Sequence, residues 1–113
     1  MHELAITKGI IDIVNSEAKK SGFKNVLEIT LRVGEYSGIV PECLREFFPI
    51  AAAGSAAERA ALVIEPIEAR FRCLDCGHEG AADRKKACCP ECRSTAIKMT
   101  AGREFFVESL KVE

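Results

Sequence analysis

The chain has 113 residues, with 16 Lys and Arg against 17 Asp and Glu and a formal net charge of -1. This length suits one modest domain with a small appendage, and the balanced charge argues against a dedicated nucleic-acid binder, which usually carries a basic field. No apolar run approaches the length of a membrane span, and the first residues lack the features of a secretory signal, so we expect a cytoplasmic protein with no membrane partner.

An amphipathic helix is predicted from residue 3 to just before Gly22. Apolar side chains fall on one half of the helical wheel and polar ones on the other; the apolar set is Leu4, Ile6, Ile10, Ile11, Ile13, Val14 and Ala18. Lys19 and Lys20 suit the negative end of the helix dipole, and Gly22 can adopt the left-handed conformation that ends a helix. The amino terminus is therefore expected to lie close to folded structure.

The next segment is predicted to form a strand followed by a second helix. Residues 27–33 alternate apolar and polar side chains, which predicts a strand with one buried face. Pro41 suits the first turn of a second helix that carries Leu44, Phe47 and Phe48 inward. Pro49 predicts a kink or an early end of this helix. The stretch "SAAE" at 55–58 has capping-box spacing and predicts a short helical turn.

Two further strands, 61–71 and 103–113, flank five of the six cysteines. Pro66 cannot donate to a ladder, so the first of them is expected to bulge or to lie at an edge. We expect these two strands to pair antiparallel, with the cysteine segment inserted at the far end of their hairpin. The predicted fold class is α+β: a three-stranded mixed sheet with two helices on one face and a zinc-ribbon-like insert between the last two strands. The predicted domains are 1–69 plus 102–113 and the insert 70–101.

The cysteines carry the strongest signal. Cys73 and Cys76 form one CxxC, Cys89 and Cys92 form another, and twelve residues separate the pairs. Two such turns can complete a tetrahedral, four-thiolate zinc site with no open position, which is structural rather than catalytic. Two disulfides, buried free thiols or a redox-active CxxC fit the paired spacing and a reducing compartment less well. Cys88 breaks the CxxC spacing with Cys92 and is left out of the ligand set.

Three other features receive simpler interpretations. Cys43 lies on the second helix and is predicted to be a small core residue. His78 is expected to be an exposed loop residue that could bind metal opportunistically. The sequence contains no nucleophile–base pair and no phosphate-binding loop, so we predict no catalytic residues and no enzyme activity.

The chain starts with Met1, His2 and Glu3. The Met1 amine, the His2 amide nitrogen and the His2 ring can form one chelate, to which Glu3 can add an amide nitrogen or a carboxylate. Nitrogen-rich tetragonal ligation favours Ni(II) or Cu(II) over Zn(II). Taken alone, this three-residue motif is weak, and a solvated His2 is the simpler interpretation.

The combination of motifs resembles the HypA/HybF family. The segments that carry the resemblance are "MHELAI", "RVGEYSGIVPE", "CLDCG" with "CCPEC", and "GREFFVESLKVE", which cover nearly the whole chain in the same order. The resemblance implies a nickel-delivery metallochaperone for [NiFe]-hydrogenase maturation, with the HypB GTPase and the hydrogenase large subunit as partners. It assigns nickel to Met1, His2 and Glu3 and zinc to the four CxxC cysteines. Departures are Cys88 and the stretch Val40–Glu42, where some members have an additional carboxylate implicated at nickel.

Our leading hypothesis is a non-enzymatic nickel chaperone, a monomer or homodimer, with Ni(II) as cargo and Zn(II) as a structural ion. The alternative is a zinc-ribbon module for nucleic acid or protein, supported by Arg84, Lys85 and Lys86 and opposed by the balanced charge and the scarcity of aromatic residues in the ribbon. A third class, an enzyme with an open zinc site, requires one of the four cysteines not to be a ligand.

Overall fold

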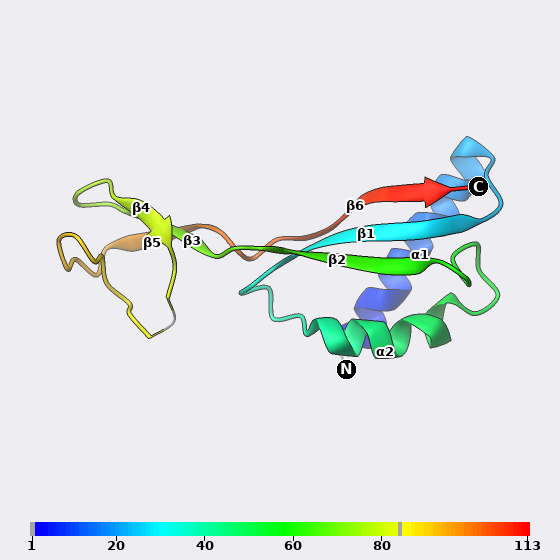
Figure 1. Ribbon diagram of the computed structural model, residues 1–113, viewed down its shortest axis with the longest axis horizontal. Helices are drawn as coiled ribbons and strands as arrows, with labels where there is room; N and C mark the ends of the chain where they lie inside the picture. The colour runs from blue at the N-terminus through cyan, green and yellow to red at the C-terminus, as the bar shows by residue number, and fades with distance from the viewer. Residues whose placement is uncertain (1, 84) are drawn as a thin grey trace. The chain divides into compact units, whose positions relative to one another are not determined.

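The structure, a computed structural model, describes residues 2–83 and 85–113 (Figure 1). The elements in chain order are α1 (His2–Ser21), β1 (Val26–Gly34), α2 (Pro41–Ala52), β2 (Ala61–Ile67), β3 (Arg70–Cys73), β4 (Glu79–Ala81), β5 (Ile97–Ala101) and β6 (Phe105–Val112). The strands form two three-stranded sheets, ordered β2-β1-β6 and β4-β3-β5. No helix within the described ranges is long and apolar enough to cross a membrane.

The chain divides into two compact units. Unit 1 comprises the residues up to Arg32 together with Ile39–Glu65 and Phe106–Glu113, and unit 2 comprises Val33–Gly38 and Pro66–Phe105. Unit 2 therefore contains the predicted insert 70–101, a few residues on either side of it, and the separate segment Val33–Gly38. The assignment of nickel to one predicted domain and zinc to the other stays a prediction.

The predicted first helix is confirmed as α1. It ends as expected, because Gly22 has a φ of 77° and its N–H donates to the Ala18 carbonyl at 2.8 Å. The apolar side of this helix is not buried throughout, since Ile13 is 48% exposed. Thr7 is buried instead, and its hydroxyl donates to the Glu3 carbonyl, so the polar group is satisfied within its own helix.

The second helix begins at Pro41 as predicted and continues to Ala52, so the predicted early end at Pro49 is wrong. Pro49 is exposed, and its missing N–H removes only the hydrogen bond to the carbonyl four residues earlier. Leu44 and Phe48 are buried as predicted. These apolar side chains hold the helix despite the proline.

The predicted helical turn at 55–58 is a hydrogen-bonded turn outside any helix. The Ser55 hydroxyl donates to the Ala52 carbonyl at 2.7 Å and accepts the Ala57 N–H at 3.1 Å. Ser55 therefore links the end of α2 to the turn that leads into β2, in place of capping a new helix.

The predicted mixed three-stranded sheet with two helices is confirmed in unit 1 (Figure 1). Its central strand is β1, whose Ile29 and Leu31 are completely buried. The expected pairing of the last two long strands is wrong, because β1 lies between β2 and β6. The most thoroughly buried strand takes the central position, where both of its edges are paired. Pro66 accordingly lies on an edge strand, as predicted.

The strand predicted over 61–71 is divided into β2 and β3. Between them Ala69 is completely buried, and its N–H donates to the Glu35 carboxylate at 3.2 Å. The backbone of Gly102 lies so close to Ala69 that only glycine fits there, since a Cβ at Gly102 would lie 2.6 Å from the Ala69 Cα. From there β3 pairs antiparallel with both β4 and β5.

Unit 2 has a small apolar core. The buried cluster beside the sulfur atoms consists of Phe71, Cys73 and Cys89, and among the described residues Ala82 and Ile97 pack against it as partly buried apolar side chains. Two of the three buried side chains are cysteines of the predicted zinc set. Apolar burial alone therefore supplies little stability to this unit.

Candidate metal centre

The first CxxC lies in a tight turn at the end of β3. The Gly77 N–H donates to the Cys73 carbonyl at 3.0 Å, and the Cys73 N–H donates to the His78 carbonyl at 2.8 Å. The Cys76 N–H points at the Cys73 sulfur, 3.5 Å away. We call this hydrogen-bonded turn, Cys73–His78, the first knuckle.

The second CxxC repeats the same pattern, and we call Cys89–Ser94 the second knuckle. The Arg93 N–H donates to the Cys89 carbonyl at 2.8 Å, and the Cys89 N–H donates to the Ser94 carbonyl at 2.8 Å. The residue after each CxxC has a left-handed backbone: φ is 78° at Gly77 and 62° at Arg93. Both residues occupy the same position after a CxxC, so the two knuckles share one backbone geometry although only the first has a glycine there.

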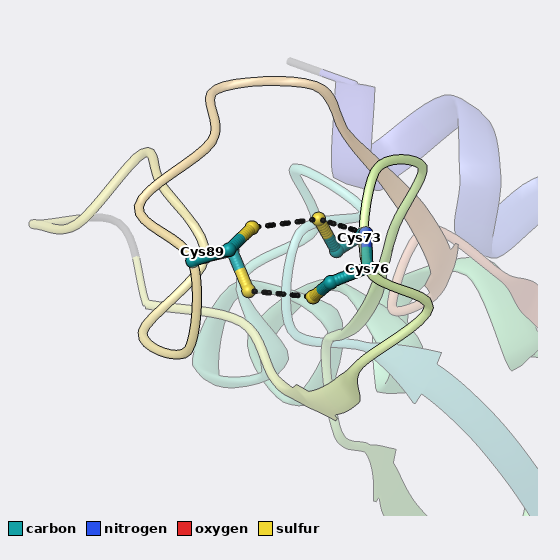
Figure 2. Close-up of side chains that lie close together, drawn as sticks. Cys73, Cys76 and Cys89 are labelled. Carbon is teal, nitrogen blue, oxygen red and sulfur yellow. Dashed lines mark hydrogen bonds between the residues drawn. The ribbon is translucent and has the colours of Figure 1, made fainter.

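The two knuckles bring four sulfur atoms together. The sulfur atoms of Cys73, Cys76, Cys89 and Cys92 all lie within 4.8 Å of one another, and the described part of the chain holds no other group of three or more metal-ligating side chains this close. The Cys73–Cys92 and Cys76–Cys89 sulfur pairs are 3.5 and 3.6 Å apart. Figure 2 shows the side chains of Cys73, Cys76 and Cys89 close together, with these two sulfur contacts as dashed lines.

This spacing fits a tetrahedral zinc ion. Zn–S bonds of about 2.3 Å at tetrahedral angles place sulfur atoms roughly 3.8 Å apart, close to the separation of both sulfur pairs. All six cysteines are free thiols, so no disulfide competes for the four sulfurs. The cluster is consistent with the predicted zinc-ribbon-like site.

Polar contacts connect the two knuckles. The Ser94 hydroxyl donates to the Asp75 carboxylate and accepts the Ala96 N–H at 3.0 Å. The Leu74 N–H donates to the Ala96 carbonyl at 2.8 Å. These bonds fix one turn against the other, so the sulfur cluster is held by backbone geometry from both sides.

The four thiols differ in acidity. The backbone N–H of Cys76 lowers the pKa of the Cys73 thiol to about 7, although burial opposes this shift. For Cys92, the backbone N–H of Ser94 lowers the pKa, but the Cys73 sulfur, burial and the other two thiols outweigh it and raise the pKa to about 12. One thiol of the cluster therefore ionises near neutral pH, and its charge opposes ionisation of its neighbour.

The pKa of the Cys76 thiol is also raised by its neighbours. The backbone N–H of His78 lowers its pKa, but burial and the sulfurs of Cys89 and Cys73 outweigh that effect, so the pKa is raised. Four thiolates cannot share this volume without a compensating cation. The donor set and its electrostatics both suit a divalent ion that prefers sulfur.

Cys88 lies outside the sulfur cluster. It is half-buried and, with Phe71 and Ile97, lines a cavity of about 420 Å³ in unit 2. His78 is half-buried too, and its ring packs against Phe71 with centroids 5.8 Å apart and planes at 56°. His78 thus lies in a loop, as expected, but it is half-buried and not exposed, and its ring packs against the small core.

The predicted nickel ligands lie at the start of α1. Met1 and the side chain of His2 are outside the described residues, whereas the backbone of His2 opens the helix and Glu3 lies in its first turn. The first four N–H groups of a helix have no acceptor within it, so the amides of His2 and Glu3 lack intrahelical partners. Arg84, which belongs to the basic cluster considered above, is likewise outside the described residues.

Comparison with known proteins gives a match along the whole chain. A family model described as "Hydrogenase/urease nickel incorporation, metallochaperone, hypA" matches residues 1–112. A relative from Chlorobium luteolum named hydrogenase maturation factor HypA is 42% identical over 113 residues, covering 100% of this chain and 97% of the relative. A relative of the same name from Dehalococcoides mccartyi is 36% identical, covering 100% of this chain and 95% of the relative.

Two solved structures share the fold. The solution structure of the Ni metallochaperone HypA from Helicobacter pylori matches with a TM-score of 0.70 and 22% identity, covering 97% of this chain and 96% of that one. A second solution structure of a HypA protein matches with a TM-score of 0.75 and 23% identity, covering 100% of this chain and 97% of that one. At these identities the likeness supports the fold only.

Zinc should be bound by four sulfur atoms, and Cys88 should be dispensable. Zinc-edge X-ray absorption on the purified protein is expected to fit a shell of sulfur alone, because the cluster leaves no open position. Cys88→Ala should keep one zinc per chain and the same spectrum, whereas Cys89→Ala should lose sulfur from the shell. A nitrogen or oxygen ligand in the unmodified protein, or loss of zinc only in Cys88→Ala, would contradict this ligand set.

Zinc binding should displace protons. Without metal, the raised pKa values keep the Cys76 and Cys92 thiols protonated at neutral pH wherever the cluster persists, and in an unfolded unit 2 all four thiols have the ordinary cysteine pKa of about 8.5, so each zinc should release at least two protons. Affinity should therefore fall as the pH falls, because protons compete for the thiolates. Calorimetric titration with zinc in two buffers of different ionisation enthalpy measures the number of protons released per zinc. Release of fewer than two protons would exclude this assignment of protonation states.

The two left-handed residues allow a matched test of the knuckle geometry. Gly77→Ala places a Cβ on a left-handed backbone and should destabilise zinc-loaded unit 2 by about 1–2 kcal/mol, although no atom lies within 4 Å of the new methyl group. Arg93→Gly relieves the equivalent strain and should change stability by less than about 1 kcal/mol, since glycine also gains entropy in the unfolded chain. Chemical denaturation of both zinc-loaded variants measures their free energies of unfolding. Equal losses of stability in the two variants would mean that backbone strain does not cause the effect of Gly77→Ala.

Proposed function

Because the chain belongs to the HypA family of hydrogenase/urease nickel-incorporation metallochaperones, we propose that it binds Ni(II) at its amino terminus and delivers it for [NiFe]-hydrogenase maturation. The observation that carries the proposal is the family match over residues 1–112, which includes the opening Met1, His2 and Glu3. The protein acts as a carrier and not as an enzyme.

The start of α1 supports this ligand set chemically. The amide nitrogens of His2 and Glu3 are not used by the helix, so a metal can displace their protons without breaking an intrahelical bond. The helix dipole opposes a cation at its amino end, but each amide that loses its proton adds a compensating negative charge. Binding is then of moderate strength, which suits a carrier that must release its cargo.

The sulfur cluster holds zinc as a structural ion. When bound, Zn(II) supplies the positive charge that lets four thiolates lie together. The residues that hold it are Cys73, Cys76, Cys89 and Cys92, and the backbone N–H and C=O groups of Cys73 and Cys89 are already engaged within the knuckles. The ion leaves no open coordination position in this geometry, and its binding free energy, about 10 kcal/mol or more for such modules, is available to fold unit 2.

The proposed partners follow from the carrier role. The HypB GTPase and the hydrogenase large subunit would supply or receive the nickel in the cytoplasm, and nucleotide hydrolysis would come from the GTPase, since the sequence has no phosphate-binding loop. Neither nucleic acid nor membrane is a proposed partner.

The alternative, a zinc-ribbon module for nucleic acid, has weaker support. Among the described residues of its basic cluster, the Lys85 N–H donates to the Asp83 carboxylate at 2.9 Å, so an acidic group lies within the same turn. The net charge of -1 gives no overall attraction to phosphates. Binding to duplex or single-stranded DNA that weakens steeply with added salt would favour this alternative.

Nickel binding should depend on a free amino terminus. Adding a short tag before Met1 removes the amine from the chelate, and His2→Ala removes the imidazole, so both changes should abolish stoichiometric nickel binding. Zinc content and fold should be unchanged in both, because the sulfur cluster is built elsewhere. Nickel affinity should also fall below neutral pH, because the amine and imidazole take up protons.

Calorimetric titration of tagged, untagged and His2→Ala protein tests this, with the tag moved to the carboxyl end as the control. If the amino-terminally tagged protein binds nickel as tightly as the untagged one, the terminal chelate is wrong. His78 and Cys88 would then be the ligands to test next.

A further inference from the structure

One buried side chain of α1 does not match its apolar surroundings. Buried residues of the helix recur at spacings of three and four, and this row consists of Thr7, Ile10, Ile11 and Val14, with exposed fractions of 1%, 2%, 6% and 0%. The other members of the row are aliphatic, and valine has the same branched shape as threonine without its hydroxyl group. Packing alone would therefore favour valine at position 7.

The stability of the helix does not explain the hydroxyl group either. In the part of the chain that the structure describes, the buried polar side chains are those of Thr7 and of Thr30 on β1, which is 8% exposed. Burying a hydroxyl group costs free energy unless it is hydrogen-bonded, and a threonine that bonds back to the preceding turn slightly destabilises a helix. A residue that departs from the local packing pattern in this way is expected at functional sites.

The hydroxyl group of Thr7 is bonded to the last residue of the proposed chelate. It donates to the backbone carbonyl of Glu3. In an α-helix this carbonyl also accepts the N–H group four residues later, which is again that of Thr7. Glu3 is thus connected by two hydrogen bonds to one residue that is itself held in the apolar core.

An anchored Glu3 favours metal binding for an entropic reason. The first turn of a helix frays easily, because its N–H groups have no partners within the helix. A chelate that uses the amides of His2 and Glu3 needs both residues in fixed positions, and fixing a residue costs conformational entropy. A residue that is already held before the metal arrives reduces this cost and raises the affinity. The hydroxyl group of Thr7 holds the carbonyl of Glu3, so the amide nitrogen of Glu3 stays available to nickel.

We propose that Thr7 is a positioning residue of the nickel site, whose buried hydroxyl group holds Glu3 so that the first three residues form the chelate with less loss of entropy. The inference rests on the proposed nickel function and adds to it a residue outside the terminal motif. Thr7 does not touch the metal and acts through the carbonyl of Glu3. Nickel affinity therefore depends on the hydroxyl group, whereas the packing of α1 does not.

Substitutions at position 7 separate the hydroxyl group from the packing of the side chain. Thr7→Val removes the hydroxyl group and keeps the branched shape, Thr7→Ala removes both, and Thr7→Ser keeps the hydroxyl group. Calorimetric titration of untagged, zinc-loaded, full-length protein with Ni(II) should show about tenfold weaker binding for Thr7→Val and Thr7→Ala, the loss expected for one hydrogen bond. Thr7→Ser should bind nickel within about twofold of the unmodified protein. The thermal midpoint of Thr7→Val should not fall, because a methyl group suits the apolar surroundings.

Thr30→Val is the matched control, since it removes the other buried hydroxyl group, on β1, and should leave nickel affinity unchanged. If the unmodified protein binds nickel and neither Thr7→Val nor Thr7→Ala weakens the binding, this inference is overturned and the nickel carrier role stands. Equal weakening in Thr30→Val, or no recovery in Thr7→Ser, also overturns it, because the effect is then a general loss of structure. Absence of nickel binding in the unmodified protein overturns the proposed function, and this inference with it.

Discussion

The convergence of four cysteine sulfurs is the constraint on which unit 2 depends. Three buried side chains form the apolar cluster around the sulfur atoms, two of them being Cys73 and Cys89 themselves, and the sheet of this unit includes a strand of only three residues. The knuckle hydrogen bonds position the sulfurs, but they also force thiols with opposed pKa shifts into one small volume. A divalent ion removes this conflict, so the same interaction that creates the site also stabilises the fold around it.

Unit 1 has a different source of stability. Its helices and central strand bury a continuous set of aliphatic and aromatic side chains, with Val14, Ile29, Leu31 and Leu44 completely inaccessible. The proposed nickel site lies at the start of α1, on an element held by this apolar core. Cargo can therefore be gained and lost at the terminus without altering the packing that holds the helix, while the zinc ion remains in a closed site.

Local patterns in the sequence predicted the elements that depend on near neighbours. Helical periodicity located α1, alternation located β1, and the paired CxxC spacing located the sulfur cluster before any geometry was known. The order of the strands was not predictable in the same way, because pairing between distant segments is decided by which strand is most deeply buried. The division of 61–71 into β2 and β3 depends on contacts of Ala69 with Glu35 and Gly102, which are remote in sequence.

Single residues were mispredicted for similar reasons. Periodicity grouped Ile13 with the apolar side of α1, although Ile13 lines a cavity beside β6. It did not identify the buried Thr7, whose hydroxyl donates within the helix. Arg93 adopts a left-handed backbone because the second knuckle repeats the first, a relation visible only when the two CxxC motifs are superposed.

The central claim, that unit 2 is stabilised mainly by its metal and unit 1 by its apolar core, is tested most directly by hydrogen exchange on zinc-loaded and zinc-depleted protein. Removing zinc should abolish amide protection in β3, β4 and β5 and leave protection in α1 and β1 almost unchanged. Retained protection of β3 without zinc, or loss of protection in both units together, would contradict the account.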